Sequence, residues 1–180
     1  MKNRCIALGV TGGIAAYKAA DLTSRLTQAG YEVNVLMTAG ACKLVTPLTF
    51  QTLSRRPVIT SLWELPQWQP GHVALADRAE LLAVVPCTAN FIGKFAHGLA
   101  DDALSTYAVT HAGPVLLAPA MNPKMWSNAA VQANVRLLES RGVALVGPDA
   151  GAVACGAAGV GRLAAVEEIV RRIQDFFKGE

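Results

Sequence analysis

The chain has 180 residues, of which 52% are hydrophobic and 16% are charged, and its formal net charge is +3. This composition excludes general disorder, and the length suits one domain over residues 1–180. The scattered basic residues argue against a nucleic-acid partner, and the longest apolar runs are far below the roughly 20 residues of a membrane span. Residues 1–4 lead into a strand-like run without a secretory cleavage site, so we expect a cytoplasmic protein with reduced thiols and no membrane partner.

Strand-like and helix-like segments alternate along the chain, because apolar runs of strand length are followed by amphipathic stretches that end at glycine or proline. In the first half of the chain we expect a strand at 5–10, a helix at 14–29, a strand at 31–37, a helical stretch at 38–53 with a break or kink at Pro47, and an extended connection at 55–71. Next we expect a strand at 81–86, a helical region at 88–112 interrupted near Asp101 and Asp102, and a strand at 114–118. The last elements are a helix at 123–141, a last strand at 142–146, a glycine- and alanine-rich loop at 147–161 and a closing helix at 164–177.

This alternation predicts an α/β fold: a doubly wound, mostly parallel sheet with helices on both faces. Ligands of such sheets bind beyond the carboxyl ends of the strands. We therefore expect the loops at 11–15, 37–40, 86–90 and 118–122 to converge on one edge of the sheet and to form the functional site there.

The first of these loops is a glycine turn, Thr11–Ala15, between a strand and a helix. Glycines permit a close backbone approach, and the free N–H groups of the first helical turn favour an anion such as a phosphate. The turn matches neither the G-x-G-x-x-G dinucleotide motif nor a P-loop. A tight turn without a ligand is the alternative.

Two further turns are framed by proline and contain asparagine. In residues 86–90, Thr88 is suited to cap the following helix, and Asn90 is suited to hydrogen-bond the edge of a planar ligand. Residues 118–123 place the amide of Asn122 and the thioether of Met121 at the same edge. Capping without ligand binding is the alternative for both turns.

Two other segments carry reactive side chains. His72 has a proton affinity suited to proton exchange near neutral pH, whereas His97 and His111 are interpreted as ordinary surface or boundary residues. Residues 151–162 include four glycines and Cys155, a composition typical of a mobile lid that delivers a thiol, with a plain loop as the alternative. The remaining cysteines are interpreted as small apolar fillers, and no residue spacing suggests a metal site.

Five motifs in this order resemble the homo-oligomeric flavin-containing cysteine decarboxylases over nearly the whole chain. The motifs are Gly12–Lys18, Gly71–Val73, Pro86–Asn90, Pro119–Asn122 followed by Met125 and Trp126, and Ala154–Gly156 followed by Gly159, Gly161 and Arg162. In many bacteria such a domain is the front half of a longer chain that also carries a ligase. Because this sequence stops at Glu180, we expect either a separate ligase or a longer parent chain.

The resemblance implies FMN as the cofactor and assigns roles to individual residues. His72, Asn122 and Cys155 match the catalytic histidine, the amide that binds the substrate carboxylate, and the acid on a flexible flap. Lys94 lies where a basic residue would suit a substrate phosphate or carboxylate. The implied FMN contacts are Gly12, Gly13, Ile14, Ala15, Thr38, Thr88, Ala89, Asn90 and Met121, and the implied further substrate contacts are Ala152, Val153 and Ala154.

The implied reaction is the decarboxylation of a small phosphorylated thiol, 4′-phosphopantothenoylcysteine, in coenzyme A biosynthesis. Loss of CO₂ from an sp³ carbon requires an electron sink, which transient oxidation of the cysteine moiety by FMN would supply. The resemblance also implies a homo-oligomer, either a trimer or a dodecamer built from trimers. The alternatives are a peptidyl-cysteine decarboxylase, a non-catalytic flavin-binding subunit and a prenyl-flavin synthase, and Cys155 argues against the first and the last.

Overall fold

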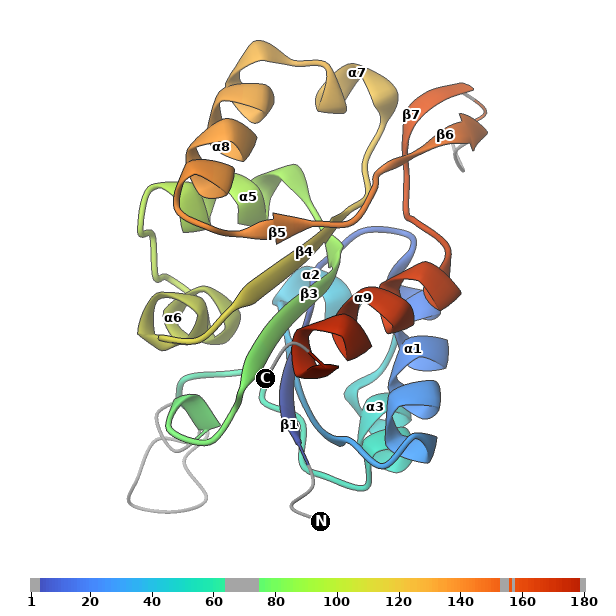
Figure 1. Cartoon of the computed structure of the whole chain (residues 1–180), viewed down its shortest axis with the longest axis vertical. Coiled ribbons are helices and arrows are strands. Elements are labelled where there is room, and N and C mark those ends of the chain that lie inside the picture. Colours follow the sequence, from blue (N-terminus) through green and yellow to red (C-terminus); the bar gives the residue numbers. More distant parts are fainter. Residues whose placement is uncertain (1–3, 64–74, 153–155, 157, 179–180) are drawn as a thin grey trace.

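The computed structural model describes residues 4–63, 75–152, 156 and 158–178 (Figure 1). Its centre is a five-stranded parallel sheet with strand order β2-β1-β3-β4-β5. The strands are β1 (Cys5–Val10), β2 (Glu32–Met37), β3 (Leu81–Cys87), β4 (Val115–Pro119) and β5 (Ala144–Leu145). The prediction of a doubly wound parallel α/β fold is therefore confirmed.

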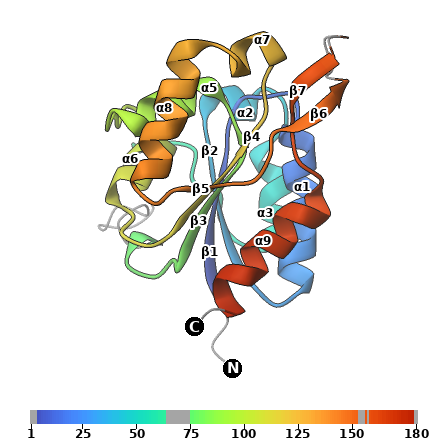
Figure 2. The same ribbon diagram turned by 45° about the horizontal axis from the view of Figure 1, so that its top comes forward.

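Helices cover both faces of this sheet (Figures 1 and 2). One face packs against α1 (Ala16–Gln28), α3 (Pro47–Ser54) and α9 (Val166–Lys178), and the other packs against α5 (Ala89–Ala96), α6 (Ala103–Thr110) and α8 (Ala129–Ser140). The central strands are buried on both sides, which explains why they are continuous apolar runs rather than alternating ones.

Alternate residues of β1 belong to different cores, as the period of two in a strand requires. Ile6 and Leu8 contribute to the core under α1 and α9, where Leu22 and Ile169 are fully buried. Ala7 contributes to the core under α5 and α6, together with Leu104. Two separate apolar layers thus hold the sheet in place and fix which ends of its strands reach the surface.

Both expected interruptions of helical regions are confirmed. The stretch at 38–53 divides into α2 (Ala39–Cys42) and α3, and Pro47 occupies the first turn of α3, where its missing N–H costs nothing. The region at 88–112 divides into α5 and α6, and Asp102 begins α6 with a capping box shared with Ser105.

The prediction of one helix over 123–141 is wrong. The structure has a short helix, α7 (Pro123–Trp126), followed by α8 from Ala129. The interruption lies at Asn128, whose side chain accepts a hydrogen bond from the Ala130 N–H at 2.9 Å. A side chain that bonds the backbone in this way competes with the helical pattern and starts a new helix instead.

The prediction that 142–146 is the last strand and 147–161 a loop is also wrong. Two further strands, β6 (Asp149–Ala152) and β7 (Ala158–Arg162), pair antiparallel and form a separate two-stranded sheet. This hairpin lies next to α7, at the end of the molecule where the carboxyl ends of the central strands meet (Figure 2). Its glycine-rich strands lack the alternation that identifies a strand.

The expected connection at 55–71 is only partly described. Within residues 55–63, an isolated bridge pairs Ile59 with Leu36 of β2, and Trp63 is 89% exposed. Residues 64–71, and with them Trp68, lie outside the described residues. No helix in the described part of the chain is both long and apolar enough to cross a membrane.

Candidate active site

A cavity of about 1280 Å³ opens at the carboxyl edge of the sheet. It is lined by the loops that follow β1, β2, β3 and β4, together with residues of β7. The predicted convergence of the loops at 11–15, 37–40, 86–90 and 118–122 on one edge is thus confirmed. Such a volume exceeds that of most small-ligand sites and is sufficient for two ligands side by side.

Thr11 connects the first and third of these loops. Its hydroxyl donates a hydrogen bond to the Pro86 carbonyl at 2.7 Å and accepts one from the Thr88 N–H at 3.0 Å. Because Thr11 is buried, these bonds hold the glycine turn against the start of α5. Sequence reasoning gave Thr11 no separate role, since its partners are more than 70 residues away in the chain.

The glycine turn packs closely against the loop after β2. A Cβ atom added to Gly12 would lie 2.9 Å from both the C and Cα atoms of Gly40, so glycine at position 12 is required for this approach. No described side chain caps the start of α1. The Ala16 and Lys18 N–H groups of its first turn donate to the Gly13 and Ala15 carbonyls. The start of α1 lines the cavity, and the positive end of its helix dipole is a suitable environment for a phosphate.

Three of the predicted site residues are helix caps as well. Thr38, Thr88 and Asn122 accept hydrogen bonds from backbone N–H groups of α2, α5 and α7, respectively. The Asn122 bond, from the Lys124 N–H, is 2.9 Å long. These caps confirm the structural role foreseen for Thr88, and they also fix each side chain at the rim of the cavity.

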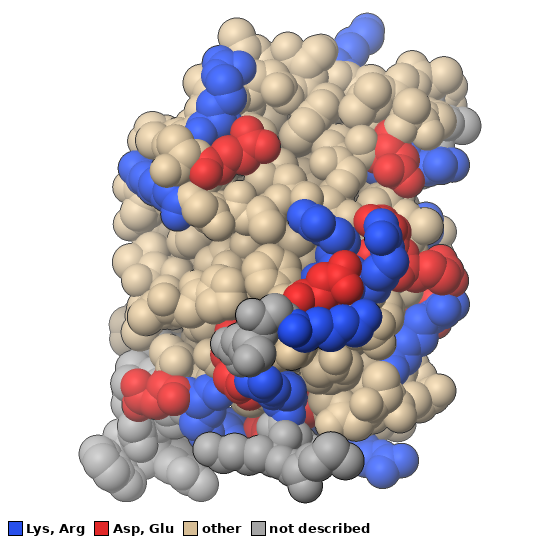
Figure 3. Space-filling view, viewed as in Figure 1, with Lys and Arg blue, Asp and Glu red and all other residues tan. Residues whose placement is uncertain are grey.

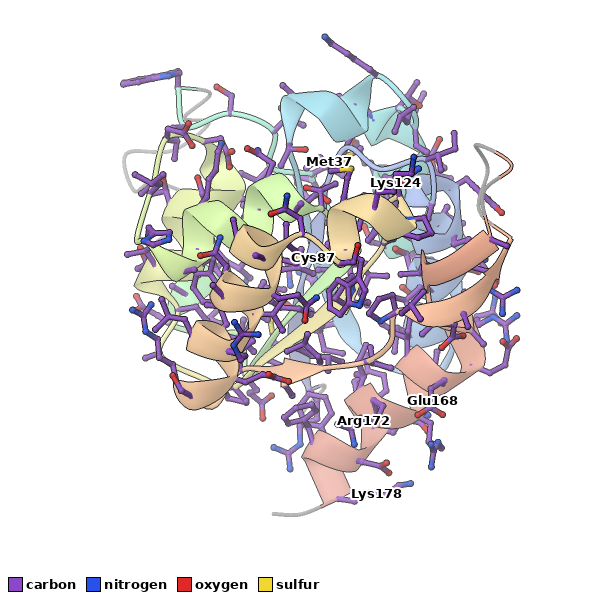
Figure 4. All side chains as sticks on the ribbon, turned by 90° about the horizontal axis from the view of Figure 1, so that it is seen from above. Met37, Cys87, Lys124, Glu168, Arg172 and Lys178 are labelled. Atoms are coloured by element: carbon purple, nitrogen blue, oxygen red, sulfur yellow. The ribbon has the colours of Figure 1, made fainter. Side chains whose placement is uncertain are left out.

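Figure 4 shows this edge from above, with α7 and Lys124 in front and the end of β3 beneath. Cys87, the last residue of β3, is fully buried and does not line the cavity. Burial raises the pKa of the Cys87 thiol far above its ordinary value. The interpretation as apolar fillers is confirmed for Cys87 and for half-buried Cys42, which packs against the core. Cys5 is buried, but its thiol donates to Glu32 at 3.7 Å and accepts from Asn34 at 3.3 Å, so it is more than an apolar filler.

Lys94 lines the cavity but forms ion pairs within the protein. Its ammonium group lies 2.6 Å from Asp101 and 2.9 Å from Asp102. Burial lowers the pKa of Lys94, but hydrogen bonds to the two carboxylates raise it by more, so it stays charged. Its charge is balanced locally, and the role of Lys94 as an anion ligand stays a prediction.

All residues predicted to contact the cofactor line this cavity. These residues are Gly12, Gly13, Ile14, Ala15, Thr38, Thr88, Ala89, Asn90 and Met121. Sequence reasoning missed several further lining residues, of which Lys18 and Arg162 are basic and Tyr17 and Phe91 are aromatic. The available signal was their position in the sequence. Tyr17 and Lys18 follow the glycine turn, Phe91 follows the Thr88–Asn90 turn, and Arg162 ends the glycine-rich segment.

Several predicted residues lie outside what the structure describes. His72, Val153, Ala154 and Cys155 belong to undescribed segments, and Ala152 is described only as a member of β6. Their roles therefore stay predictions. His111 is buried between the Tyr107 hydroxyl and the Pro114 carbonyl, and His97 contacts Asn134 at 3.0 Å, so both histidines lie apart from the cavity lining.

A family model described as Flavoprotein matches residues 1–178. The chain belongs to this flavoprotein family. Among curated relatives, a probable phosphopantothenoylcysteine decarboxylase of Streptococcus mutans is 42% identical over 173 residues, which cover 94% of this chain and 97% of that protein. The coenzyme A biosynthesis bifunctional protein CoaBC of Bacillus subtilis is 45% identical over 183 residues, covering 100% of this chain. The chain spans only 45% of that longer relative.

Two solved structures resemble the fold over almost its full length. A mutant PPC decarboxylase complexed with pantothenoylaminoethenethiol superimposes with a TM-score of 0.87 at 26% identity, covering 98% of this chain and 100% of that one. The FMN-dependent cysteine decarboxylase SpaF gives a TM-score of 0.83 at 30% identity, with 98% of each chain covered. The fold thus agrees with that of these decarboxylases over nearly the whole of this chain.

Proposed function

We propose that this chain is an FMN-dependent decarboxylase that converts 4′-phosphopantothenoylcysteine to 4′-phosphopantetheine in coenzyme A biosynthesis. The observation that carries the proposal is the cavity, where the predicted flavin contacts and Asn122 line one continuous surface. The Streptococcus mutans relative, matched over nearly its full length, supports the same activity. Enzymes of this reaction class are carboxy-lyases.

The described residues fit a flavin mononucleotide. The close backbone approach at Gly12 and the uncapped start of α1 suit its phosphate, and the Thr88–Asn90 turn suits the polar edge of a planar ring. Gly13, Ile14, Ala15, Thr38 and Met121 complete the set that would hold it. When bound, FMN supplies a reversible two-electron oxidation of the cysteine moiety, which makes loss of CO₂ possible.

The protein's own groups bind the substrate and move protons. The Asn122 amide is proposed to bind the carboxylate that leaves as CO₂, and its cap on α7 holds it at the rim. His72 is proposed to exchange the proton of the substrate thiol. Cys155 is proposed to supply a proton to the carbon of the ene-thiolate that remains after CO₂ loss, while the two electrons removed in the oxidation return to it and give the thiol product. Ala152, Val153 and Ala154 would contact the substrate from the hairpin.

We further propose that the protein works as a homo-oligomer, either a trimer or a dodecamer of trimers. Large apolar side chains at the cavity are exposed in the single chain: Ile14 at 63%, Tyr17 at 61% and Met125 at 49%. Such a group of exposed apolar residues around a site is typical of a surface that another protein covers. Measurement of the native mass by light scattering tests this assembly.

The experiment that tests the activity mixes purified protein with 4′-phosphopantothenoylcysteine without oxygen and records the flavin spectrum and the product mass. A loss of about 44 mass units with oxidised flavin at the end supports the full reaction. A loss of about 46 with bleached flavin indicates an ene-thiol product instead. With Cys155→Ser we expect that ene-thiol to accumulate, and normal product from this variant would contradict the role of Cys155.

An absence of any reaction would direct the test to a peptide that ends in cysteine. A peptidyl-cysteine decarboxylase is the second candidate, because the sequence resembles the flavin-containing cysteine decarboxylases as a group and SpaF, an FMN-dependent cysteine decarboxylase, is 30% identical. If neither substrate reacts while FMN binds, the chain is a non-catalytic flavin-binding subunit. Each outcome therefore selects one of the three functions.

A further inference from the structure

The strand β7 lies directly on the turn that carries Asn122. The Met121 N–H donates a hydrogen bond to the Gly161 carbonyl at 2.9 Å, and Gly161 is buried. Both Gly161 and the Met121–Asn122 pair line the cavity. The hairpin and the turn are therefore joined at the wall of the proposed active site.

A side chain at position 161 would not fit in this arrangement. A Cβ atom there would lie 2.3 Å from the Met121 carbonyl oxygen, 3.2 Å from the Pro123 nitrogen and 3.4 Å from the Asn122 carbonyl carbon. These neighbours are backbone atoms, which cannot rotate away as a flexible side chain can. Gly161 does not have a positive φ, so its backbone conformation is open to other residues, and the close approach alone requires glycine.

The neighbouring glycine of β7 makes a similar contact. A Cβ atom at Gly159 would lie 2.9 Å and 3.1 Å from the Cβ and Cγ atoms of Pro123. Here the neighbour is the proline ring rather than the backbone, and φ is +149°. Position 159 thus contacts the same turn as Gly161, but less directly.

We propose that Gly161 is a positioning residue for Asn122: the bare backbone of β7 sets the place of the 121–123 turn and so the place of the Asn122 amide in the cavity. The proposal rests on the function proposed above for Asn122. An alanine at 161 would have to move the turn or the strand by roughly 0.7 Å to restore the 3.0 Å that real Cβ contacts keep. A misplacement near 1 Å costs on the order of 10²-fold in rate.

The test compares Gly161→Ala with Gly93→Ala, a matched control in α5. A Cβ atom at Gly93 would lie 3.6 Å from its nearest neighbour, the Asn134 Nδ2 atom, which is an ordinary contact. We expect Gly161→Ala to lower kcat/KM for decarboxylation about 10²-fold while FMN stays bound, and Gly93→Ala to stay within about twofold of the wild type. Activity within about twofold for Gly161→Ala would overturn the proposal.

A second comparison separates positioning from general damage to the fold. If Gly161 acts through Asn122, then adding Gly161→Ala to Asn122→Ala should cost less than about threefold, because the group being positioned is already absent. An equal loss in both backgrounds would overturn the proposal. If Gly161→Ala does not fold, Gly159→Ala replaces it, with an expected loss of about tenfold and the same non-additivity; no loss would overturn the proposal.

A readout independent of activity keeps this test separate from the test of the proposed function. If the wild type does not decarboxylate its substrate, the proposed function fails, and hydrogen exchange at the Met121 amide then decides the positioning claim. We expect exchange at this amide to be about tenfold faster in Gly161→Ala than in Gly93→Ala, because the bond to the Gly161 carbonyl is strained. Equal exchange rates in the two variants would overturn the claim.

Discussion

Polar residues make different interactions at the two edges of the central sheet, where the amino ends and the carboxyl ends of its strands lie. At the amino edge, Glu32 forms ion pairs with Arg56 at 3.1 Å and with Arg78 at 2.9 Å. Arg4 forms an ion pair with Glu80 at 2.6 Å. At the carboxyl edge, short side chains cap helices around an open cavity. The amino edge is closed by these ion pairs. The carboxyl edge has internal ion pairs of Lys94 with Asp101 and Asp102, but it also presents backbone and amide groups to a ligand.

This difference places the residues that stabilise the sheet at its amino edge and the residues that would bind a ligand at its carboxyl edge. Long charged side chains close the amino edge with ion pairs. On the face shown in Figure 3, acidic and basic side chains likewise lie next to one another. Glycine, alanine, threonine and asparagine line the carboxyl edge, because small residues leave space and let backbone N–H groups reach a ligand. Substitutions at the two edges should therefore fail in different ways, which the following predictions test.

The largest effect is expected for Asn122→Asp. The substitution keeps the shape of the cap but replaces an amide donor with a carboxylate, which repels the substrate carboxylate. We expect kcat/KM to fall about 10³-fold, with yellow FMN still bound and the melting temperature little changed. Loss of the flavin instead would mean that Asn122 holds the cofactor or the fold, and absorbance at the flavin band distinguishes the two.

The next effect is expected for Gly12→Ala, which should act on the cofactor. The new methyl group would overlap the Gly40 backbone at 2.9 Å and separate the two loops. We expect FMN affinity to fall at least about tenfold, measured by equilibrium fluorescence. Gly93→Ala is the comparison, because its nearest contact would be 3.6 Å away and Gly93 does not line the cavity; an equal loss in both variants would contradict this explanation.

A smaller effect, on stability alone, is expected for Glu32→Gln at the amino edge. The Glu32 side chain is 16% exposed, and its loss of charge leaves two partly exposed arginines without a partner. We expect the free energy of unfolding to fall by about 1–2 kcal/mol in urea denaturation, with kcat per folded, flavin-loaded chain unchanged. A change in kcat would mean that the two edges are coupled.

The same residue makes a prediction about acid. Burial raises the pKa of Glu32, but the Asn34 hydrogen bond and the charges of Arg56 and Arg78 lower it by more, so the net pKa lies below its ordinary value of 4.5. A depressed carboxyl pKa contributes stability above the ordinary value, and that stability is lost as the pH falls through the folded-state pKa. Glu32→Gln should therefore flatten the stability profile below about pH 4.5.

The smallest effect is expected for His111. Burial lowers the pKa of this imidazole below its ordinary value of 6.5, although the Pro114 carbonyl raises it in part. The unfolded chain thus binds a proton first, and stability should decline as the pH falls below 6.5, by at most about 1.4 kcal/mol per pH unit. His111→Asn should remove this slope below pH 6.5, measured by thermal unfolding in a pH series.

The sequence predicted the central sheet well because its strands are buried on both faces and therefore form uninterrupted apolar runs such as 5–10 and 81–86. It predicted the cavity for the same reason, since parallel strands bring their following loops together. The β6–β7 hairpin was missed because its stability depends on contact with the 121–123 turn, about 40 residues earlier, and not on its own pattern.

The pairing of Lys94 was missed for a related reason. Asp101 and Asp102 lie at the start of another helix, and only the packing of α5 against α6 brings them to the lysine. A spacing of seven or eight residues across an interruption predicts no contact by itself, unlike the three or four residues within one helix. The neutralisation of the Lys94 charge at the carboxyl edge therefore depends on the folded structure and cannot be predicted from the order of residues in the chain.

The burial of the cysteines also determines how the protein will respond to thiol reagents. Cys87 is fully enclosed, the pKa of Cys5 is raised to about 11, largely by burial, and that of half-buried Cys42 is raised as well. Alkylation requires the thiolate, so these three should react slowly near neutral pH. Rapid labelling of the native protein would then report on Cys155. If a bound substrate slows this labelling, the rate of the thiol reaction becomes a direct assay of that position, without any engineered cysteine.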